Sequence, residues 1–323
     1  MSTFDATSDA ARRPFKGRRT HFGDLILQVT AGLAAAGAIF LVGMIIYKVV
    51  EGARLSLSTF GLGFLTHTSE INGDIGGKAF LIGTAVTSIG ALALATPLAL
   101  GVALFLSELA PGWIRGPVTA LVETLAAIPS VVIGLWGIIV LIPNLRLHVM
   151  PALHSTLGFI PLFGPVTGTG ASIFAAIIVL TIMILPIIAS ISRELFLGVP
   201  AELKEGALAL GTTRWEMVRG VVFPFARGGV AAAMILGLAR ALGEAIAVSM
   251  VIGAFNGFSW NLFSAGDTLA GRLANDYSSP GTAPTATSSL FYLAVILLVF
   301  SIVVNLIAQV IVRRAERRQG LVR

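Results

Sequence analysis

The stretch ELKEGALALGTTRWEMVRGVVFP, Glu202–Pro224, is a charged connection between two long apolar runs. Pro200 precedes a run of strong helix formers, and Gly211 with two threonines behind it is typical of a helix stop. A second helix is predicted over residues 213–222, with one of the threonines as its N-cap and Pro224 limiting its end. The stretch is therefore predicted to be a short helical hairpin outside the membrane.

The composition around this hairpin is that of a membrane protein. The chain has 323 residues, of which 56% are hydrophobic and 12% charged, and its mean hydropathy is +0.91. The absence of cysteine excludes a disulfide framework, a cysteine-bound metal and a thiol nucleophile. The net charge is +6, but most lysines and arginines lie beside apolar runs, so we expect no nucleic-acid binding.

Six charge-poor runs reach the length of about 20 apolar residues that crosses a bilayer. The predicted spans are 25–47, 79–106, 118–141, 171–191, 229–255 and 290–312. Connections 142–170 and 256–289 are rich in Gly, Pro, Ser and Thr and are predicted to be loops, the former apolar enough to lie in the interface or re-enter. The predicted fold class is an all-α membrane protein with six transmembrane helices.

Most of the cations lie on the side that holds both chain ends, which predicts that both termini are cytoplasmic. The predicted organisation is a basic N-terminal segment 1–24, a six-helix domain 25–312 with the cytoplasmic connection 193–227, and a basic tail 313–323. The two basic ends are expected to contact membrane lipid through anionic headgroups.

The run GLARALGEAIAVSM, Gly237–Met250, places two opposite charges inside a predicted span. Arg240 lies about 20 Å along a helix beyond Arg227, near the midplane, where it stays protonated and must face protein or water. Glu244 follows one helical turn later on the same face, within reach of the guanidinium.

This pair suggests a transport pathway. We expect Arg240 to attract a tetrahedral oxyanion, and Glu244 to hold the guanidinium and to keep binding weak enough for release. The alternative is a structural ion pair that only locks helix packing.

The hairpin resembles the EAA loop of ABC importer permeases, which has the pattern E-A-A, x3, G, x9, I-x-L-P. Glu205, Gly206, Ala207, Gly211 and the run VVFP that ends at Pro224 keep this spacing, with conservative departures. The resemblance implies a coupling helix that docks on a separate ATPase subunit. The alternative is an ordinary solvated helical hairpin.

Two further segments sharpen the resemblance. LARALGEAIAV, residues 238–248, is similar to a helix of the phosphate-specific importers, in which an Arg and a Glu are implicated in transport. ETLAAIPSVVIGLWG, residues 123–137, resembles a segment of their PstC-type subunit. Ser130 follows Pro129 and can bond a carbonyl that the proline frees, which makes it a further pathway candidate. The alternative there is a proline kink without ligand contact.

The resemblance implies a permease subunit of a phosphate importer in the bacterial plasma membrane. It also implies the partners: a second homologous permease, two copies of a cytoplasmic ABC ATPase and an extracytoplasmic phosphate-binding protein. Because the chain has no nucleotide-binding motif, we expect no enzyme activity, metal or cofactor on it, with ATP and Mg on the ATPase. The alternatives are the sister permease, an importer of another oxyanion, or an ion-coupled secondary transporter.

Overall fold

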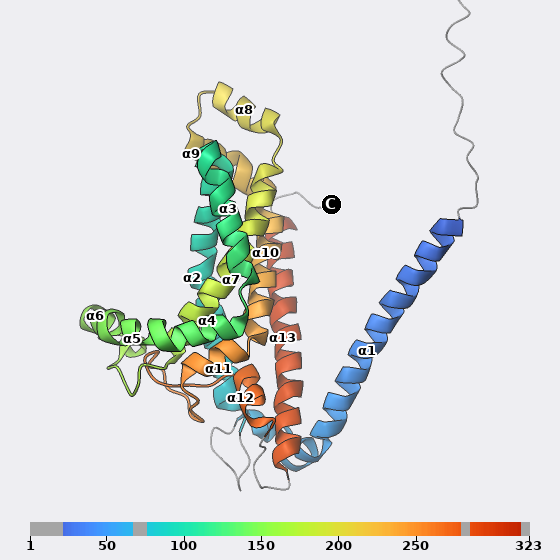
Figure 1. Ribbon diagram of the computed structural model, residues 1–323, viewed down its shortest axis with the longest axis vertical. Helices are drawn as coiled ribbons and strands as arrows, with labels where there is room; N and C mark the ends of the chain where they lie inside the picture. The colour runs from blue at the N-terminus through green and yellow to red at the C-terminus, as the bar shows by residue number, and fades with distance from the viewer. Residues whose placement is uncertain (1–21, 67–75, 279–284, 318–323) are drawn as a thin grey trace, which may run out of the picture. The chain divides into compact units, whose positions relative to one another are not determined.

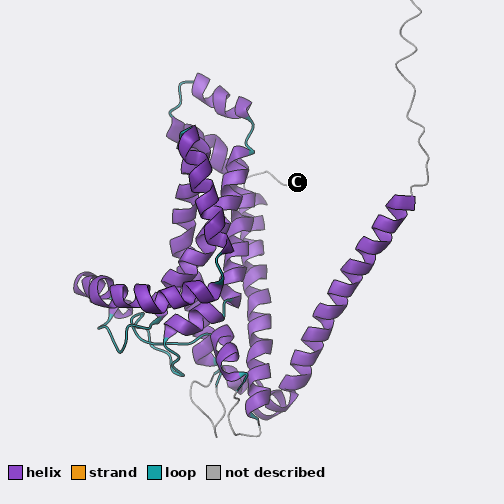
Figure 2. Cartoon of the chain, in the orientation of Figure 1, coloured by secondary structure: helices purple, strands orange, loops and turns teal. Residues whose placement is uncertain are grey.

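The structure, a computed structural model, describes residues 22–66, 76–278 and 285–317. In these ranges the chain forms helices and loops only (Figure 2), which confirms the predicted all-α class. The described residues contain six helical segments that are long and apolar enough to cross a membrane. The predicted basic ends, 1–24 and 313–323, lie mostly outside these ranges, and their lipid contacts stay predictions.

The helices follow in this order (Figure 1). The first part of the chain forms α1 (Phe22–Phe60), η2 (Gly61–Leu65), α2 (Lys78–Leu104), η3 (Phe105–Leu109) and α3 (Gly112–Ala127). The middle part forms α4 (Ser130–Trp136), η4 (Gly137–Leu141), α5 (Ile142–Asn144), η5 (Leu145–Val149), α6 (Met150–Leu157), η6 (Pro161–Phe163) and α7 (Ile173–Leu197). The last part forms α8 (Ala201–Ala209), α9 (Arg214–Met217), η7 (Val218–Val222), α10 (Phe223–Gly243), α11 (Ile246–Ile252), α12 (Leu269–Asp276) and α13 (Ala286–Arg317).

The chain divides into two compact units, 1–48 and 49–323, with the boundary inside α1. The described part of the first unit is the apolar N-terminal portion of α1. The second unit contains all the other helices. The last turns of α1 belong to it and are fastened to α13 by serines, since Ser56 donates its backbone N–H to Ser288 Oγ at 3.0 Å and its hydroxyl lies 3.0 Å from Ser289 Oγ.

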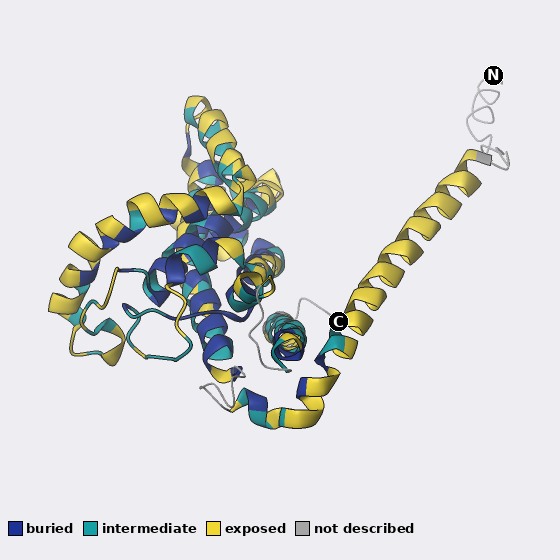
Figure 3. Ribbon diagram, turned by 60° about the horizontal axis from the view of Figure 1, so that its bottom comes forward, coloured by how far each residue is buried: buried dark blue, intermediate teal, exposed yellow. Residues whose placement is uncertain are grey.

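Helix α7 is the centre of the second unit and packs mainly against α2 and α10. Small residues allow these close approaches: Ala91, Ala95 and Ala99 on α2 are completely buried. Figure 3 shows the buried residues gathered where the packed helices of this unit face one another. On α10, a Cβ added to Gly237 would lie 2.9 Å from Ile188 on α7. The apolar core therefore fixes the heights of α2, α7 and α10 relative to one another.

The third predicted span, 118–141, is wrong as a single helix. Helix α3 ends at Ala127 and α4 begins at Ser130, because the two residues between them have extended ψ angles of 128° and 139°. A residue that stands directly before a proline disfavours the helical conformation, and Ile128 stands directly before Pro129. Figure 1 shows α4 and α5 running across the direction of α3. The segment long enough to cross a membrane is Ser130–Leu157.

The two predicted loops also contain helix. The helical path continues through α5, η5 and α6 to Leu157, well into the predicted loop 142–170. In the predicted loop 256–289, Thr268 starts α12 by accepting a hydrogen bond from the Gly271 N–H at 3.1 Å. Proline and glycine content therefore overstated the extent of loop on this side of the molecule.

Three prolines within these helices follow wide turns. Pro143, Pro151 and Pro224 each stand two residues after a five-residue π-helical turn, and the helix runs through all three. A proline lacks the N–H for the usual bond and its ring crowds the preceding turn, so a wider turn relieves the clash. The prediction that Pro224 limits the second hairpin helix is therefore wrong, since the helix continues from Arg214 to Gly243.

Candidate functional site

The hairpin predicted from the sequence is present and projects from one end of the bundle (Figure 1). Glu205, Gly206 and Ala207 lie in the middle of α8, and Glu205 is exposed. Gly211 has a φ of +84°, the left-handed region that a side chain disfavours, so the chain reverses here after α8. Thr212 donates its hydroxyl to the Ala207 carbonyl at 2.8 Å and holds the turn.

The second helix starts as predicted at a threonine N-cap. The Thr213 hydroxyl accepts a hydrogen bond from the Glu216 N–H at 3.3 Å, and the Glu216 carboxylate accepts one from the Thr213 N–H at 2.7 Å. This reciprocal capping box fixes the direction in which α9 leaves the turn. The hairpin is thus a defined shape built from local signals.

The hairpin presents apolar side chains to its surroundings. Leu208 is 41% exposed, Trp215 65% and Leu210 87%, although α8 carries several charges. Exposed Trp and Leu on a rigid polar hairpin favour a protein-binding surface over an ordinary solvated turn.

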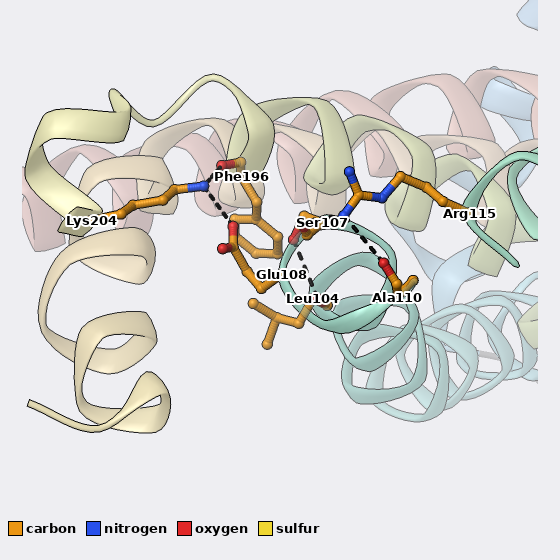
Figure 4. Close-up of polar contacts among 7 residues, drawn as sticks. All are labelled: Leu104, Ser107, Glu108, Ala110, Arg115, Phe196 and Lys204. Carbon is orange, nitrogen blue, oxygen red and sulfur yellow. Dashed lines mark hydrogen bonds and ion pairs between the residues drawn. The ribbon is translucent and has the colours of Figure 1, made fainter. Parts of the chain in front are cut away.

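The inner side of α8 is fastened to the bundle by Lys204. Its ammonium lies 2.6 Å from Glu108 Oε1 and donates a second hydrogen bond to the Phe196 carbonyl at 3.0 Å (Figure 4). Only 17% of the Lys204 side chain and 11% of the Glu108 side chain are exposed. Glu108 lies on η3 at the end of α2, and it could not be predicted from the sequence because nothing local relates it to a hairpin far along the chain.

A cavity of about 490 Å³ opens beside this ion pair. Its walls come from η3, α8, α9 and the following π turn, and both charged groups of the pair line it. Next to it, Arg115 at the start of α3 donates to the carbonyls of Ser107 and Ala110, each at 3.3 Å (Figure 4). The hairpin, α2 and α3 therefore meet at one polar junction.

The intramembrane pair has a different geometry. Arg240 lies one helical turn beyond Gly237, which packs against Ile184 and Ile188 in the middle of α7. Arg240 Nη2 is 4.0 Å from Glu244 Oε2, longer than the 2.7–2.9 Å of a charge-assisted hydrogen bond. The Arg240 side chain is 45% exposed, whereas that of Glu244 is 9% exposed. The guanidinium therefore keeps donors free for another acceptor.

Glu244 stands at a helix break that the sequence analysis did not predict. Helix α10 ends at Gly243, and Glu244 has an extended ψ of 115°. Its Oε1 accepts a hydrogen bond from the Ala247 N–H at 3.2 Å, close to the start of α11. The carboxylate thus organises the first turn of α11 while its other oxygen faces Arg240, and the predicted continuous span 229–255 is wrong at this point.

Ser130 opens α4, and α4 packs against α11. The approach is close, since a Cβ added to Gly134 would lie 3.0 Å from Ala247 Cα. In the described part of the chain the Ser130 side chain has no hydrogen bond, so the predicted bond to a freed carbonyl is not formed. The structure brings the elements that carry Ser130 and Glu244 together without linking the two side chains.

A third group of charges lies at the opposite end of the bundle from α8. Asp267, just before α12, is 2% exposed, and its Oδ2 has no hydrogen-bond partner among the described residues. Burial raises the pKa of this carboxyl from 3.8 to about 6, against the lowering effect of the Thr268 N–H and of Arg272. Arg272 Nε is paired with Asp276 at 2.6 Å instead. No local pattern in the sequence distinguishes these residues.

Comparison with known proteins gives a consistent result. Residues 95–317 match the family described as binding-protein-dependent transport system inner membrane component. The "Phosphate transport system permease protein PstC" of Pasteurella multocida is 37% identical over 305 residues, which cover 93% of this chain and 95% of the relative. The relative with the same name from Mesorhizobium japonicum is 39% identical over 310 residues, 94% of each chain.

Two solved structures share the fold. One is a bacterial ABC transporter involved in the import of the acidic polysaccharide alginate, with a TM-score of 0.61 at 15% identity, covering 90% of this chain and 98% of that one. The other is the inward-facing MetNI methionine ABC transporter, with a TM-score of 0.52 at 21% identity, covering 73% and 94%.

Proposed function

Because the chain belongs to the family of binding-protein-dependent transport system inner membrane components, we propose that it is the permease subunit of an ATP-driven importer of inorganic phosphate. The fold and the EAA-type hairpin are those of an ABC importer permease, as the sequence predicted. The observation that carries the choice of substrate is Arg240, a half-exposed guanidinium at mid-bundle depth whose nearest acid is only loosely paired.

Phosphate and Arg240 match in charge and shape. A guanidinium presents a planar fork of N–H donors that fits two oxygens of a tetrahedral oxyanion, and it stays cationic throughout the physiological pH range. In a low-dielectric surrounding such a group attracts an anion strongly. Its exposure in this chain leaves it open to a passage shared with the second permease subunit.

Glu244 limits how strongly the anion is held. Its carboxylate is anchored by the Ala247 N–H, so it remains beside Arg240 whether or not phosphate is present. A fixed negative charge at 4.0 Å weakens the net attraction and repels the phosphate as it moves on. Ser130, on the adjoining α4, stays a candidate for a later contact in the pathway.

The hairpin is the place where ATP hydrolysis on a partner would act. Two ATPase copies, with their ATP and Mg, would dock beneath two permeases, and α8 with Glu205–Gly206–Ala207 and Gly211 would move with them. The helix that contains Pro224 would pass this movement into α10. This arrangement puts α8 and both chain ends in the cytoplasm of a bacterial cell, with the phosphate-binding protein on the other face. The chain itself would transport without catalysing a reaction.

Reconstitution tests the proposal. The chain is placed in proteoliposomes with its second permease, the ATPase and the phosphate-loaded binding protein, and radiolabelled phosphate uptake is measured. We expect uptake that requires ATP and is not reduced by excess sulfate or molybdate. Uptake inhibited by these anions would indicate an importer of another oxyanion.

The farther alternative is an ion-coupled secondary transporter in which Arg240 and Glu244 relay protons. It predicts phosphate uptake by this chain alone under a proton gradient, with no ATPase retained after purification. The loose pair does not favour a relay, because an arginine does not release its proton. That outcome would nevertheless overturn the ATP-driven function.

A further inference from the structure

We propose that the ion pair between Lys204 and Glu108 fastens the coupling helix α8 to the end of α2, so that movement of α8 reaches α2 and α3 directly as well as through the chain connections to α7 and α10. The inference rests on the proposed docking of an ATPase on α8. It names Lys204 and Glu108 as positioning residues, and neither contacts the transported anion.

The pair joins α8 to η3, whose contacting residues are 96 positions apart in the chain. Lys204 is on α8, Glu108 is on η3 at the end of α2, and Phe196 is near the end of α7. The ammonium contacts the other two residues at 2.6 and 3.0 Å. One lysine head group therefore holds three helical elements at one point (Figure 4).

The pair is suited to transmit a displacement. Both side chains are more than four-fifths buried, so salt screens their attraction less than that of a surface pair. Separating them would leave a buried carboxylate without its cation, which is strongly unfavourable. A shift of α8 therefore favours a joint shift of η3 over rupture of the pair.

From Glu108 the path continues into the membrane helices. Arg115 binds the carbonyls of Ser107 and Ala110, which ties η3 to the start of α3. Helix α3 leads to the break at Pro129, beyond which α4 packs on α11, the helix organised by Glu244. A contiguous set of packed elements thus connects α8 with the neighbourhood of the intramembrane pair.

The chain offers a matched control close by. Arg193 and Glu194 form an ion pair near the end of α7, and the Glu194 side chain is 69% exposed. Because the two residues are neighbours in one helix, this pair cannot link separate elements. Its loss changes local charge as the loss of Glu108 does, without touching the proposed connection.

The experiment measures phosphate imported per ATP hydrolysed in the reconstituted complex. The variants are Glu108→Gln, Lys204→Met, the charge-swapped double variant Glu108→Lys with Lys204→Glu, and the control Glu194→Gln. We expect each single variant to retain the ATPase and to hydrolyse ATP, while the ratio of import to hydrolysis falls by about tenfold. The swapped variant should recover most of the ratio, and the control should equal the wild type.

A second measurement follows α8 itself. Because the chain has no cysteine, the variant Leu210→Cys, at a side chain that is 87% exposed, takes a spin label without background from this chain. The label is read before the ATPase is added, because Leu210 lies on the surface proposed to bind it. Label mobility should rise in Lys204→Met and stay unchanged in Glu194→Gln. If Glu108→Gln does not reach the membrane, label mobility in Lys204→Met still tests the inference.

The outcomes separate the two proposals. If the wild-type complex imports phosphate and the single variants keep the wild-type ratio of import to ATP hydrolysis, this inference alone is overturned. A swapped variant no better than the single variants also overturns it, because pairing is then not what matters. Wild-type chain that retains no ATPase overturns the proposed function, and this inference with it.

Discussion

The two ion pairs at the ends of the proposed mechanism differ in a way that reflects their tasks. Lys204 and Glu108 are 2.6 Å apart and both mostly buried, and the lysine has a further acceptor in the Phe196 carbonyl. Arg240 and Glu244 are 4.0 Å apart, and only the acid is buried. The first pair is satisfied within the chain, whereas the second leaves a cation with unused donors.

The same apolar protein therefore contains one ion pair with a structural role and one with a proposed role in transport. A buried pair with short contacts has its charges compensated within the chain, and separating the elements it joins is unfavourable. A loosely paired guanidinium has already lost part of its hydration but keeps hydrogen-bonding capacity. Removing Arg240 should therefore abolish binding of the transported anion, whereas removing Lys204 should uncouple its movement.

The largest effect is expected for Arg240→Gln. Charge-assisted hydrogen bonds are worth about 1.5–3 kcal/mol each, so phosphate uptake should fall by roughly hundredfold. The amount of complex and its ATP hydrolysis without binding protein should stay near wild type. Arg240→Lys keeps the charge but not the fork and should recover only part of the uptake. Normal uptake by Arg240→Gln would make the loose pair merely structural.

Asp267 is a buried acid whose Oδ2 has no hydrogen-bond partner among the described residues. Its folded pKa of about 6 exceeds the ordinary 3.8, so the folded state holds its proton more firmly than the unfolded chain does. The contribution of this carboxyl to the stability of the folded state is therefore most favourable below about pH 4 and is lost as the pH rises through about 6. Asp267→Asn should remove this loss and stabilise the chain by on the order of 2 kcal/mol at pH 7.5.

Thermal unfolding in detergent at pH 4.5 and pH 7.5 checks the Asp267 prediction. The difference between variant and wild type should appear at pH 7.5 and shrink at pH 4.5. An equal difference at both values would mean that Asp267 acts through shape and not through its charge.

Glu244→Gln should have a smaller effect on phosphate uptake than Arg240→Gln. The glutamine can still accept the Ala247 N–H, so α11 should keep its first turn, while the charge beside Arg240 is lost. Phosphate should then be held more tightly and released more slowly. We expect kcat for uptake to fall by roughly tenfold with KM unchanged or lower. A raised KM with normal kcat would show that Glu244 helps the anion to bind.

Local signals in the sequence predicted the hairpin well, and they failed where distant contacts decide. The glycine stop at Gly211 and the threonine cap of α9 depend only on neighbouring residues, so both were predictable. The break after Gly243 depends on how α11 packs against α4 and α7, which the apolar run does not reveal. The Lys204–Glu108 contact joins residues 96 positions apart and has no sequence signal.

Prolines misled the prediction for a related reason. A proline normally ends a helix, but the effect depends on the turn before it, and a π turn before Pro224 lets the helix continue. The third span failed in the opposite direction, since apolar character continued across Pro129 while the backbone did not. Composition thus predicted membrane residence, and backbone geometry decided where each helix starts and ends.

The smallest predicted effect concerns the turn at Gly211, which sets the direction of α8 relative to α9. At Gly211, with φ +84°, a Cβ meets no atom within 4 Å, so Gly211→Ala introduces backbone strain alone, about 1 kcal/mol. Gly206 also has open space but lies in the regular helix α8, where alanine is favoured by about 1 kcal/mol and restores the E-A-A pattern. Gly211→Ala should weaken ATPase binding by about fivefold, measured by titration of the ATPase onto the permease complex, and Gly206→Ala should not. Equal weakening by both would mean that the added methyl groups obstruct docking, and that the direction of α8, which Lys204 shares in fixing, contributes little to it.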